Sequence, residues 1–126
     1  MTTAENRRLV ERYFAAWDAG DLDAFDDLMA PDYVNHSPSI PNPPPGPDGL
    51  KPIVVALRTG FPDLRHDIVH LVAEGDLVAA HVRVTGTNAG PLFGAPATGR
   101  RIDVAQMQFE QIRDGRIVAH WRVTGT

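Results

Sequence analysis

Apolar residues near the start of the chain recur at the spacing of an α-helix. One helical stripe is formed by Leu9, Val10, Tyr13, Phe14 and Trp17. Thr2 and Glu5 have the spacing of a capping box, which predicts the start of a helix. Gly20 is placed to end this helix, because glycine readily adopts the left-handed conformation that closes many helices.

A second helix and a short extended segment are predicted next. Asp21 is placed to cap the helix, and Pro31 to close it. Its apolar face would hold Phe25, Leu28 and Met29. Residues 33–36 form a short segment that we expect to be a strand or an extended turn.

Prolines dominate the segment that follows. Residues 38–47 hold six prolines in ten positions, which excludes a helix and a central strand. We expect a stiff polyproline loop on the surface. The alternative, a ligand for a proline-recognition domain, has no other support in the sequence. A third helix is predicted over 49–58, with Asp48 as its cap and Gly60 after its end.

The second half of the chain changes to a period of two, which is typical of strands. The strand-like segments, rich in Val, Ile and Thr, are 64–73, 77–87, 101–112 and 116–124. Glu74-Gly75-Asp76 and Asp114-Gly115 are hairpin turn signals, and 88–99 is a long loop. The element order α-α-β-α-β-β-β-β predicts a single α+β domain over residues 1–126. A curved antiparallel sheet, cone-shaped and wrapped around the N-terminal helices, would leave a cavity at one end.

Composition narrows the function classes. Of 126 residues, 43% are hydrophobic and 22% charged, which excludes wholesale disorder. There is no cysteine, so disulfides, thiolate metal sites and cysteine nucleophiles are excluded together. The net charge of −4 and the absence of a basic run argue against a nucleic-acid partner. No stretch approaches the ~20 apolar residues that span a bilayer, and no signal-peptide pattern is present, so we expect a cytoplasmic protein without a membrane partner.

Several motifs match a known family along nearly the whole chain. They include Tyr-Phe-Ala-Ala-Trp at 13–17, Ala-Pro-Asp-Tyr-Val-Asn-His at 30–36, Phe-Gly-Ala-Pro-Ala-Thr-Gly-Arg at 93–100 and Asp-Gly-Arg-Ile-Val-Ala-His-Trp at 114–121. With these motifs the chain resembles SnoaL-like polyketide cyclases and the related ester cyclases of the nuclear-transport-factor-two-like superfamily. The resemblance implies a cone-shaped α+β barrel with an apolar pocket, a homodimer formed through the sheet, and acid/base catalysis that needs no metal and no organic cofactor.

Two positions depart from the family pattern. Many relatives read His-Trp-Asp near the end of the last strand, and that aspartate resembles the acid/base of the cyclases. The corresponding residue here is Arg122, which cannot serve as a carboxylate base. Asn88 stands where many ester cyclases have histidine.

Enolate chemistry in a dry pocket requires a base near a carbonyl and donors for the developing oxyanion. His36 is the first candidate base. The resemblance implies this role, because the superfamily's steroid isomerases place a catalytic carboxylate at the position that corresponds to His36. Asn35 is a candidate oxyanion donor. The alternatives are structural: His36 would cap the proline loop, and Asn35 would bond to loop backbone.

Further candidates lie on the last two strands. Gln106 and Gln108 share one strand face with Val104 and Glu110, and the family resemblance places polar pocket residues at this pair. A solvated sheet face is the alternative. Arg122, if it points inward, is a clamp for a carboxylate or an enolate; if it points outward, it is a surface charge.

The remaining predictions concern substrate contacts, metals and the core. The substrate-binding candidates are Tyr13, Trp17, Tyr33, Phe93 and His120. His66 and His70 are four residues apart, about 13 Å on a strand, which is too far for two ligands of one metal ion. Trp121 is predicted to be a core residue.

Three functions remain open on this reading. The first is a cofactor-independent cyclase or isomerase acting on a mostly apolar, polyketide-like carbonyl compound, a small apolar or aromatic substrate. The second is a non-catalytic domain that binds a small molecule. The third is an epoxide hydrolase or dehydratase, which would need a positioned water or a buried histidine with a carboxylate partner, for which Asp103 and Glu110 are candidates.

Overall fold

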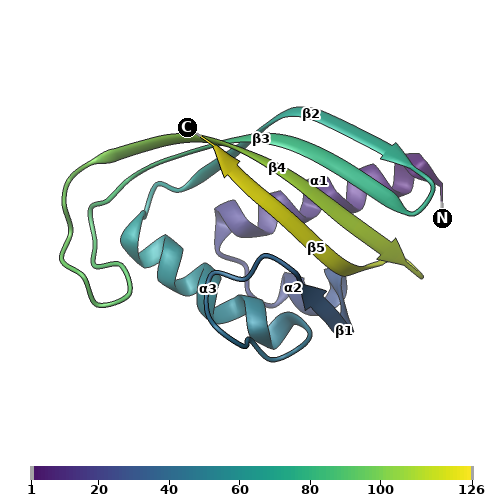
Figure 1. The fold of residues 1–126 in the computed structure, drawn as a ribbon, viewed down its shortest axis with the longest axis horizontal. Helices are drawn as coiled ribbons and strands as arrows, with labels where there is room; N and C mark the ends of the chain where they lie inside the picture. Colours follow the sequence, from purple (N-terminus) through teal and green to yellow (C-terminus); the bar gives the residue numbers. More distant parts are fainter. Residues whose placement is uncertain (1, 126) are drawn as a thin grey trace.

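The computed structural model describes residues 2–125, and it consists of three helices and one five-stranded sheet (Figure 1). In chain order the elements are α1 (Thr3–Ala19), α2 (Ala24–Leu28), β1 (Met29–Asn35), α3 (Pro47–Gly60), β2 (Arg65–Glu74), β3 (Leu77–Thr87), β4 (Arg101–Arg113) and β5 (Arg116–Gly125). The α+β class is confirmed. Within residues 2–125, no helix is both long and apolar enough to cross a membrane.

Helix α1 begins and ends where the sequence predicts. The Glu5 N–H donates to Thr2 Oγ1 and the Thr2 N–H donates to Glu5 Oε1, both at 3.1 Å, so the capping box is complete. Gly20 follows the helix in the left-handed conformation, with φ at 65°. The apolar stripe of α1 packs against the sheet and forms the centre of the core.

The sheet is curved and open, with the strand order β1-β5-β4-β3-β2. The pairs β2–β3, β3–β4 and β4–β5 are antiparallel, whereas β1 pairs with β5 in parallel. The four strands predicted to be antiparallel are antiparallel, and the short segment for which a strand or an extended turn was expected belongs to a fifth strand, which pairs in parallel. A parallel neighbour needs a long crossover connection, and residues 36–115 separate these two strands.

The junction between α2 and β1 also differs from the prediction. The second helix ends at Leu28, and Met29 already belongs to the strand. Pro31 disfavours helical geometry at the residue before it, so the chain turns extended early. Pro31 is tolerated because β1 is an edge strand, where a missing N–H leaves no ladder bond unmade.

The proline segment is anchored on β1 and leads directly into α3. The Gly46 N–H donates to the Tyr33 carbonyl at 2.9 Å. A Cβ on Gly46 would lie 2.6 Å from the Pro31 carbonyl oxygen, so this close approach requires glycine. Helix α3 starts two residues earlier than predicted, at Pro47, because proline suits the first turn of a helix.

A β-bulge in β5 determines which of its side chains face the core. Ile112 pairs with Ile117 and Gln111 pairs with Ala119, so Val118 is left out of the register. Strict alternation would place Ile117 and His120 on opposite faces. The extra residue instead buries both of them.

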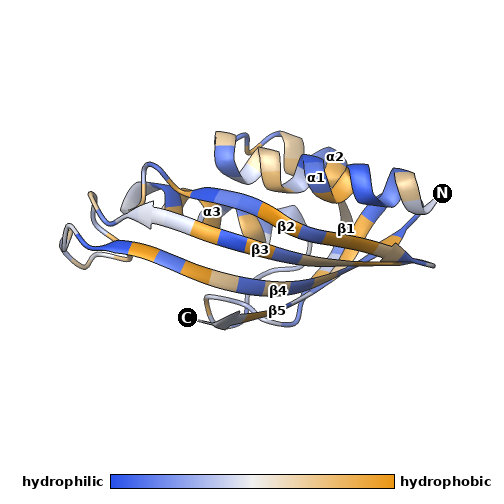
Figure 2. Cartoon of the chain, turned by 90° about the horizontal axis from the view of Figure 1, so that it is seen from above, coloured by the Kyte–Doolittle hydropathy of each residue, from blue (hydrophilic) through white to orange (hydrophobic). Residues whose placement is uncertain are grey.

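The helices lie on one side of the sheet, as Figure 2 shows, and the opposite face carries apolar side chains into solvent. The exposed apolar residues of β4 and β5 are Met107, Phe109, Trp121 and Val123. The prediction that Trp121 is a core residue was wrong, because residue 121 alternates with the inward-facing residues 120 and 122.

Candidate active site

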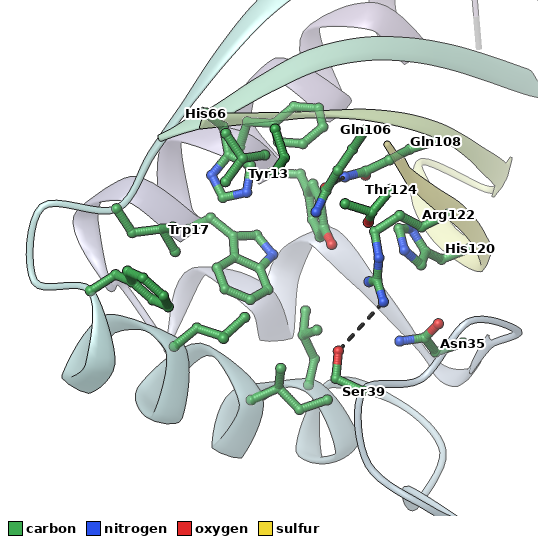
Figure 3. A pocket seen from close by; sticks show the side chains of 18 of the residues that line it. Tyr13, Trp17, Asn35, Ser39, His66, Gln106, Gln108, His120, Arg122 and Thr124 are labelled. Carbon is green, nitrogen blue, oxygen red and sulfur yellow. Dashed lines mark hydrogen bonds between the residues drawn. The ribbon is translucent and has the colours of Figure 1, made fainter. Parts of the chain in front are cut away.

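One cavity lies between α1, α3 and the inner face of the sheet (Figure 3). Its volume is about 280 Å³, at the lower limit of ~300–1,000 Å³ for small-molecule sites. It is lined by Tyr13, Phe14, Trp17, Asn35, Ser39, Leu50, Ile53, Leu57, Phe61, Leu64, His66, Val84, Ile102, Val104, Gln106, Gln108, His120, Arg122 and Thr124. The residues of α1, α3 and β3 make an apolar wall, and those of β4 and β5 contribute most of the polar groups.

The two glutamines of β4 share one strand face, as predicted, and both line this cavity. Gln108 Nε2 donates to Gln106 Oε1 at 2.7 Å. Gln108 Oε1 is buried and has no partner among the residues that the structure describes. Gln106 has its own amide nitrogen left to donate, so the pair offers a ligand one donor and one acceptor.

A buried histidine–glutamate pair connects β5 to β4 at the cavity wall. Glu110 and His120 are cross-strand partners, 0% and 2% exposed. His120 Nδ1 lies 2.6 Å and 2.8 Å from the two Glu110 carboxylate oxygens. Burial raises the pKa of Glu110, and its interactions with His120 and Arg122 offset this only in part. The two residues therefore share a proton in an apolar environment.

This pair answers one question that the sequence left open. Of the two carboxylates considered as histidine partners, Glu110 is buried against His120. Asp103 lies on the surface, where it pairs with Arg83.

Arg122 points inward and extends towards the segment that follows β1. Its Nη2 donates to the Ser37 carbonyl at 2.7 Å and to Ser39 Oγ at 3.4 Å. Its backbone N–H donates to Ser37 Oγ at 2.9 Å. Within residues 2–125 no carboxylate oxygen lies within 4.0 Å of its guanidinium. The side chain is therefore a cation held by neutral acceptors.

A second histidine–carboxylate pair was missed in the sequence. His66, whose side chain is 7% exposed, lies beside Asp18 at the end of α1, with Nδ1 2.7 Å from Asp18 Oδ1. The His66 N–H also donates to both Asp18 oxygens, at 3.1 Å and 3.0 Å. The imidazole packs against Phe14 and Trp17, with ring centroids 5.5 Å apart in each case. The pair spans 48 positions, so no local pattern could have indicated it.

Three of the predicted site residues lie elsewhere. The His36 ring stacks on Trp121 at 4.7 Å on the outer face, so the prediction that it serves as the base in the pocket was wrong. The His36 N–H bonds to the His120 carbonyl at 2.8 Å, which continues the alternation of β1 and turns residue 36 away from the cavity that residue 35 lines. Phe93 is 58% exposed, at a loop tip with a positive φ. Tyr33 is buried, but it lines a separate, smaller cavity beside the prolines.

The other predicted residues come together around the main cavity. They are Tyr13, Trp17, Asn35, Gln106, Gln108, His120 and Arg122. Across the described part of the chain, no group of three or more histidine and acidic side chains is arranged to hold a metal ion.

Comparisons with known proteins agree with this architecture. The family model for the SnoaL-like polyketide cyclase matches residues 7–125. Aklanonic acid methyl ester cyclase of Streptomyces peucetius is 31% identical over 118 residues, which cover 89% of this chain and 79% of that protein. Nogalonic acid methyl ester cyclase of Streptomyces nogalater is 30% identical over 107 residues, 84% of this chain and 80% of that protein. The structure of TsrD from Streptomyces laurentii superposes with a TM-score of 0.86 at 29% identity, covering 98% of this chain and 90% of that one. The chain belongs to the family of SnoaL-like polyketide cyclases.

Proposed function

We propose that this protein is a cyclase that works by acid/base chemistry on a carbonyl compound, with the Glu110–His120 pair as its proton-transfer group. The observation that carries the proposal is the burial of this pair at the wall of a largely apolar cavity. A general base of this kind needs an environment that adjusts its pKa and a position beside the substrate.

Glu110 fixes the orientation of the His120 ring through the two contacts at Nδ1. When Glu110 is ionised, it accepts the Nδ1–H of His120, and Nε2 is left as the basic nitrogen. When the pair takes up another proton, Nε2–H becomes a donor. Since burial raises the pKa of Glu110, the basic form of the pair is reached at higher pH than an exposed carboxylate would allow. The proposed base should therefore gain activity as pH rises through the titration of the pair.

Arg122, Asn35 and Gln106 are the proposed donors to the polar groups of the substrate, among them the developing oxyanion. The Asn35 Oδ1 already accepts the Ser37 N–H at 2.9 Å, so the amide nitrogen of Asn35 is available to a ligand. Donors fixed in a site that excludes water stabilise negative charge more than the same donors would in water. None of these groups has to move far, because β4, β5 and β1 hold them.

In the proposed ring closure, one proton moves from the substrate to His120 and then returns to the substrate. His120 takes a proton from the carbon next to a substrate carbonyl, and the electron pair of that C–H bond forms an enolate. The enolate oxygen is stabilised by the amide N–H of Gln106, while Arg122 and Asn35 hold a second polar group of the substrate. The enolate carbon then bonds to a second carbonyl carbon of the same molecule, and that carbonyl oxygen receives the proton from His120. The product is an isomer of the substrate, and the protein returns to its starting state.

The substrates to test first are those named for the relatives, aklanonic acid methyl ester and nogalonic acid methyl ester. Purified protein should convert one of them, or a smaller compound that carries two carbonyl groups, to a product of unchanged mass and altered retention time. His120→Gln should lower the rate by about 10²–10⁴-fold, the range of a positioned acid/base group. His81→Gln, a change on the outer face, is the matched control and should retain the rate.

The assay also separates a cyclase from a binding domain. Ligands that bind in the cavity but show neither ring closure nor base-dependent exchange of the acidic C–H in D₂O would contradict the proposal. The same ligands would then support a non-catalytic small-molecule-binding domain.

We also propose that two copies of the chain pair through the outer face of the sheet. The support is the cluster of exposed apolar side chains on β4 and β5, formed by Met107, Phe109, Trp121 and Val123. Large exposed apolar patches are typical of protein–protein contacts.

A further inference from the structure

The charges around the cavity are unbalanced. None of its lining residues is an aspartate or a glutamate, and Arg122 is the one lining side chain with a permanent charge. The nearest buried carboxylate, Glu110, contacts His120 through both oxygens. Asp18 likewise contacts His66. Neither carboxylate lies within ion-pair distance of Arg122.

Most of the hydrogen-bonding capacity of Arg122 is unused within the described chain. A guanidinium carries five N–H donors in a planar fork. The contacts of Arg122 involve Nη2 alone, and its two acceptors, the Ser37 carbonyl and Ser39 Oγ, are neutral. These contacts fix the direction of the side chain. Within the described chain, they leave the N–H groups on Nε and Nη1 of Arg122 without an acceptor.

The groups next to Arg122 add donors more than acceptors. The Asn35 oxygen is occupied by the Ser37 N–H, and Figure 3 shows the Asn35 nitrogen on the side that faces Ser39 and the end of Arg122. Gln106 Oε1 is occupied by Gln108, so the amide nitrogen of Gln106 is again a free donor, and Gln108 Oε1 is the one free acceptor of this pair. An arrangement of several donors around one cation is complementary to a planar anion.

From this arrangement we infer that the cavity takes substrates that carry a free carboxylate, bound by Arg122 with Asn35 beside it. The inference rests on the proposed function, because it names the substrate class of the same cavity. It also sets this chain apart from the relatives whose names specify methyl esters, in which the carboxylate is masked. An ester offers Arg122 a neutral carbonyl, and neutral acceptors make weaker hydrogen bonds than charged ones.

The test compares two bicyclic aromatic probes that differ in charge alone, 2-naphthoate and methyl 2-naphthoate. Binding to the full chain is followed at pH 7 by calorimetry and by the fluorescence of Trp17, which lines the cavity. The carboxylate should bind at least about tenfold more tightly than the ester, as expected for one charge-assisted hydrogen bond in place of a neutral one. The preference should decrease as salt is added.

Two substitutions test whether Arg122 is responsible for the preference for the carboxylate over the ester. Arg122→Gln should bring the two probes to within about twofold of each other, and Arg122→Lys should keep part of the preference, because it retains the charge but loses the planar fork. Arg116→Gln is the matched control: it removes an exposed arginine from the other end of the same strand and should leave the preference unchanged.

Each outcome decides one question. Equal binding of acid and ester by the unmodified protein would overturn the inference, even if the protein cyclises a methyl ester. If Arg122→Gln weakens both probes equally, Arg122 only holds the loop, and the inference fails as well. A carboxylate preference without turnover would retain the inference and refute the proposed function. His120→Gln should abolish turnover yet keep the preference, which separates the two claims.

Discussion

The buried Glu110–His120 pair makes a sharp prediction about stability. In His120→Leu, Glu110 keeps its place at 0% exposure but loses its hydrogen-bonding partner. Removing one member of a buried charged pair costs about 3–5 kcal/mol in the free energy of unfolding. The double variant Glu110→Leu/His120→Leu removes both members and leaves no unpaired polar group. It should therefore be more stable than the single variant, by about 2 kcal/mol or more.

The pH dependence of the single variant's stability shows whether the pKa of Glu110 is raised or lowered. Burial raises the pKa of Glu110 above its ordinary value of 4.5, and His120→Leu removes a group that opposes this shift. A carboxyl group with a raised pKa in the folded state stabilises the protein below its unfolded pKa, and this stability is lost as pH rises through the folded pKa. The penalty of the single variant relative to the double variant should therefore be small at pH 4 and large at pH 8.

Urea unfolding of the unmodified protein and of both variants at several pH values measures these differences directly. Slopes of the unfolding curves that agree among the three proteins would show that the same surface is exposed in each. If the single variant were as stable as the double variant at pH 8, Glu110 would not be buried against His120. A penalty that shrinks as pH rises would mean that the pKa of Glu110 is lowered, and it would refute the reasoning.

Three further predictions concern other parts of the molecule. Phe109→Asp places a charge on the exposed apolar face and should halve the mass measured by light scattering, whereas Phe93→Asp at the loop tip should leave it unchanged; equal masses for both would contradict pairing through the sheet. Gly49→Ala places a Cβ 2.1 Å from a proline carbonyl oxygen and should destabilise the protein by about 1–3 kcal/mol in thermal unfolding; an unchanged melting temperature would refute this close approach. Asp18→Asn weakens the contacts to His66 and should remove about 1 kcal/mol of stability, with a change in the His66 ring ¹⁵N shifts; unaltered shifts would show that the pair does not fix the imidazole.

The sequence was most informative where one period runs without interruption. The strand predicted over 77–87 has those bounds in the structure, and its residues alternate between buried and more exposed positions along the whole length. The placement of Gln106 and Gln108 on one face followed from the same alternation, whereas the inward direction of that face did not. These predictions depend only on the period of an extended chain, so no knowledge of distant contacts was required.

The predictions failed where one residue of offset decides the outcome. His36 and Asn35 are neighbours, yet strand geometry directs their side chains to opposite faces. A chemical role assigned to both at once could not be correct for a single cavity. The bulge at Val118 is a similar case, since it depends on how β5 pairs with β4 and not on the residues of β5 alone. The Asp18–His66 pair depends on how α1 crosses the sheet, which no pattern within either segment records.

The position of the proposed base explains how a family member can carry Arg122. Residues 120 and 122 both face the cavity from β5, and two residues along a strand are about 6.6 Å apart. The resemblance to the family implies an acidic group at position 122. The proton-transfer group proposed here is His120, the neighbouring residue on the same inner face of β5. That displacement changes which carbon of a bound substrate the base can reach. It also leaves position 122 free for a cation that holds the substrate in place. In the proposed mechanism, Glu110 on the neighbouring strand gives His120 the buried carboxylate partner that position 122 does not supply.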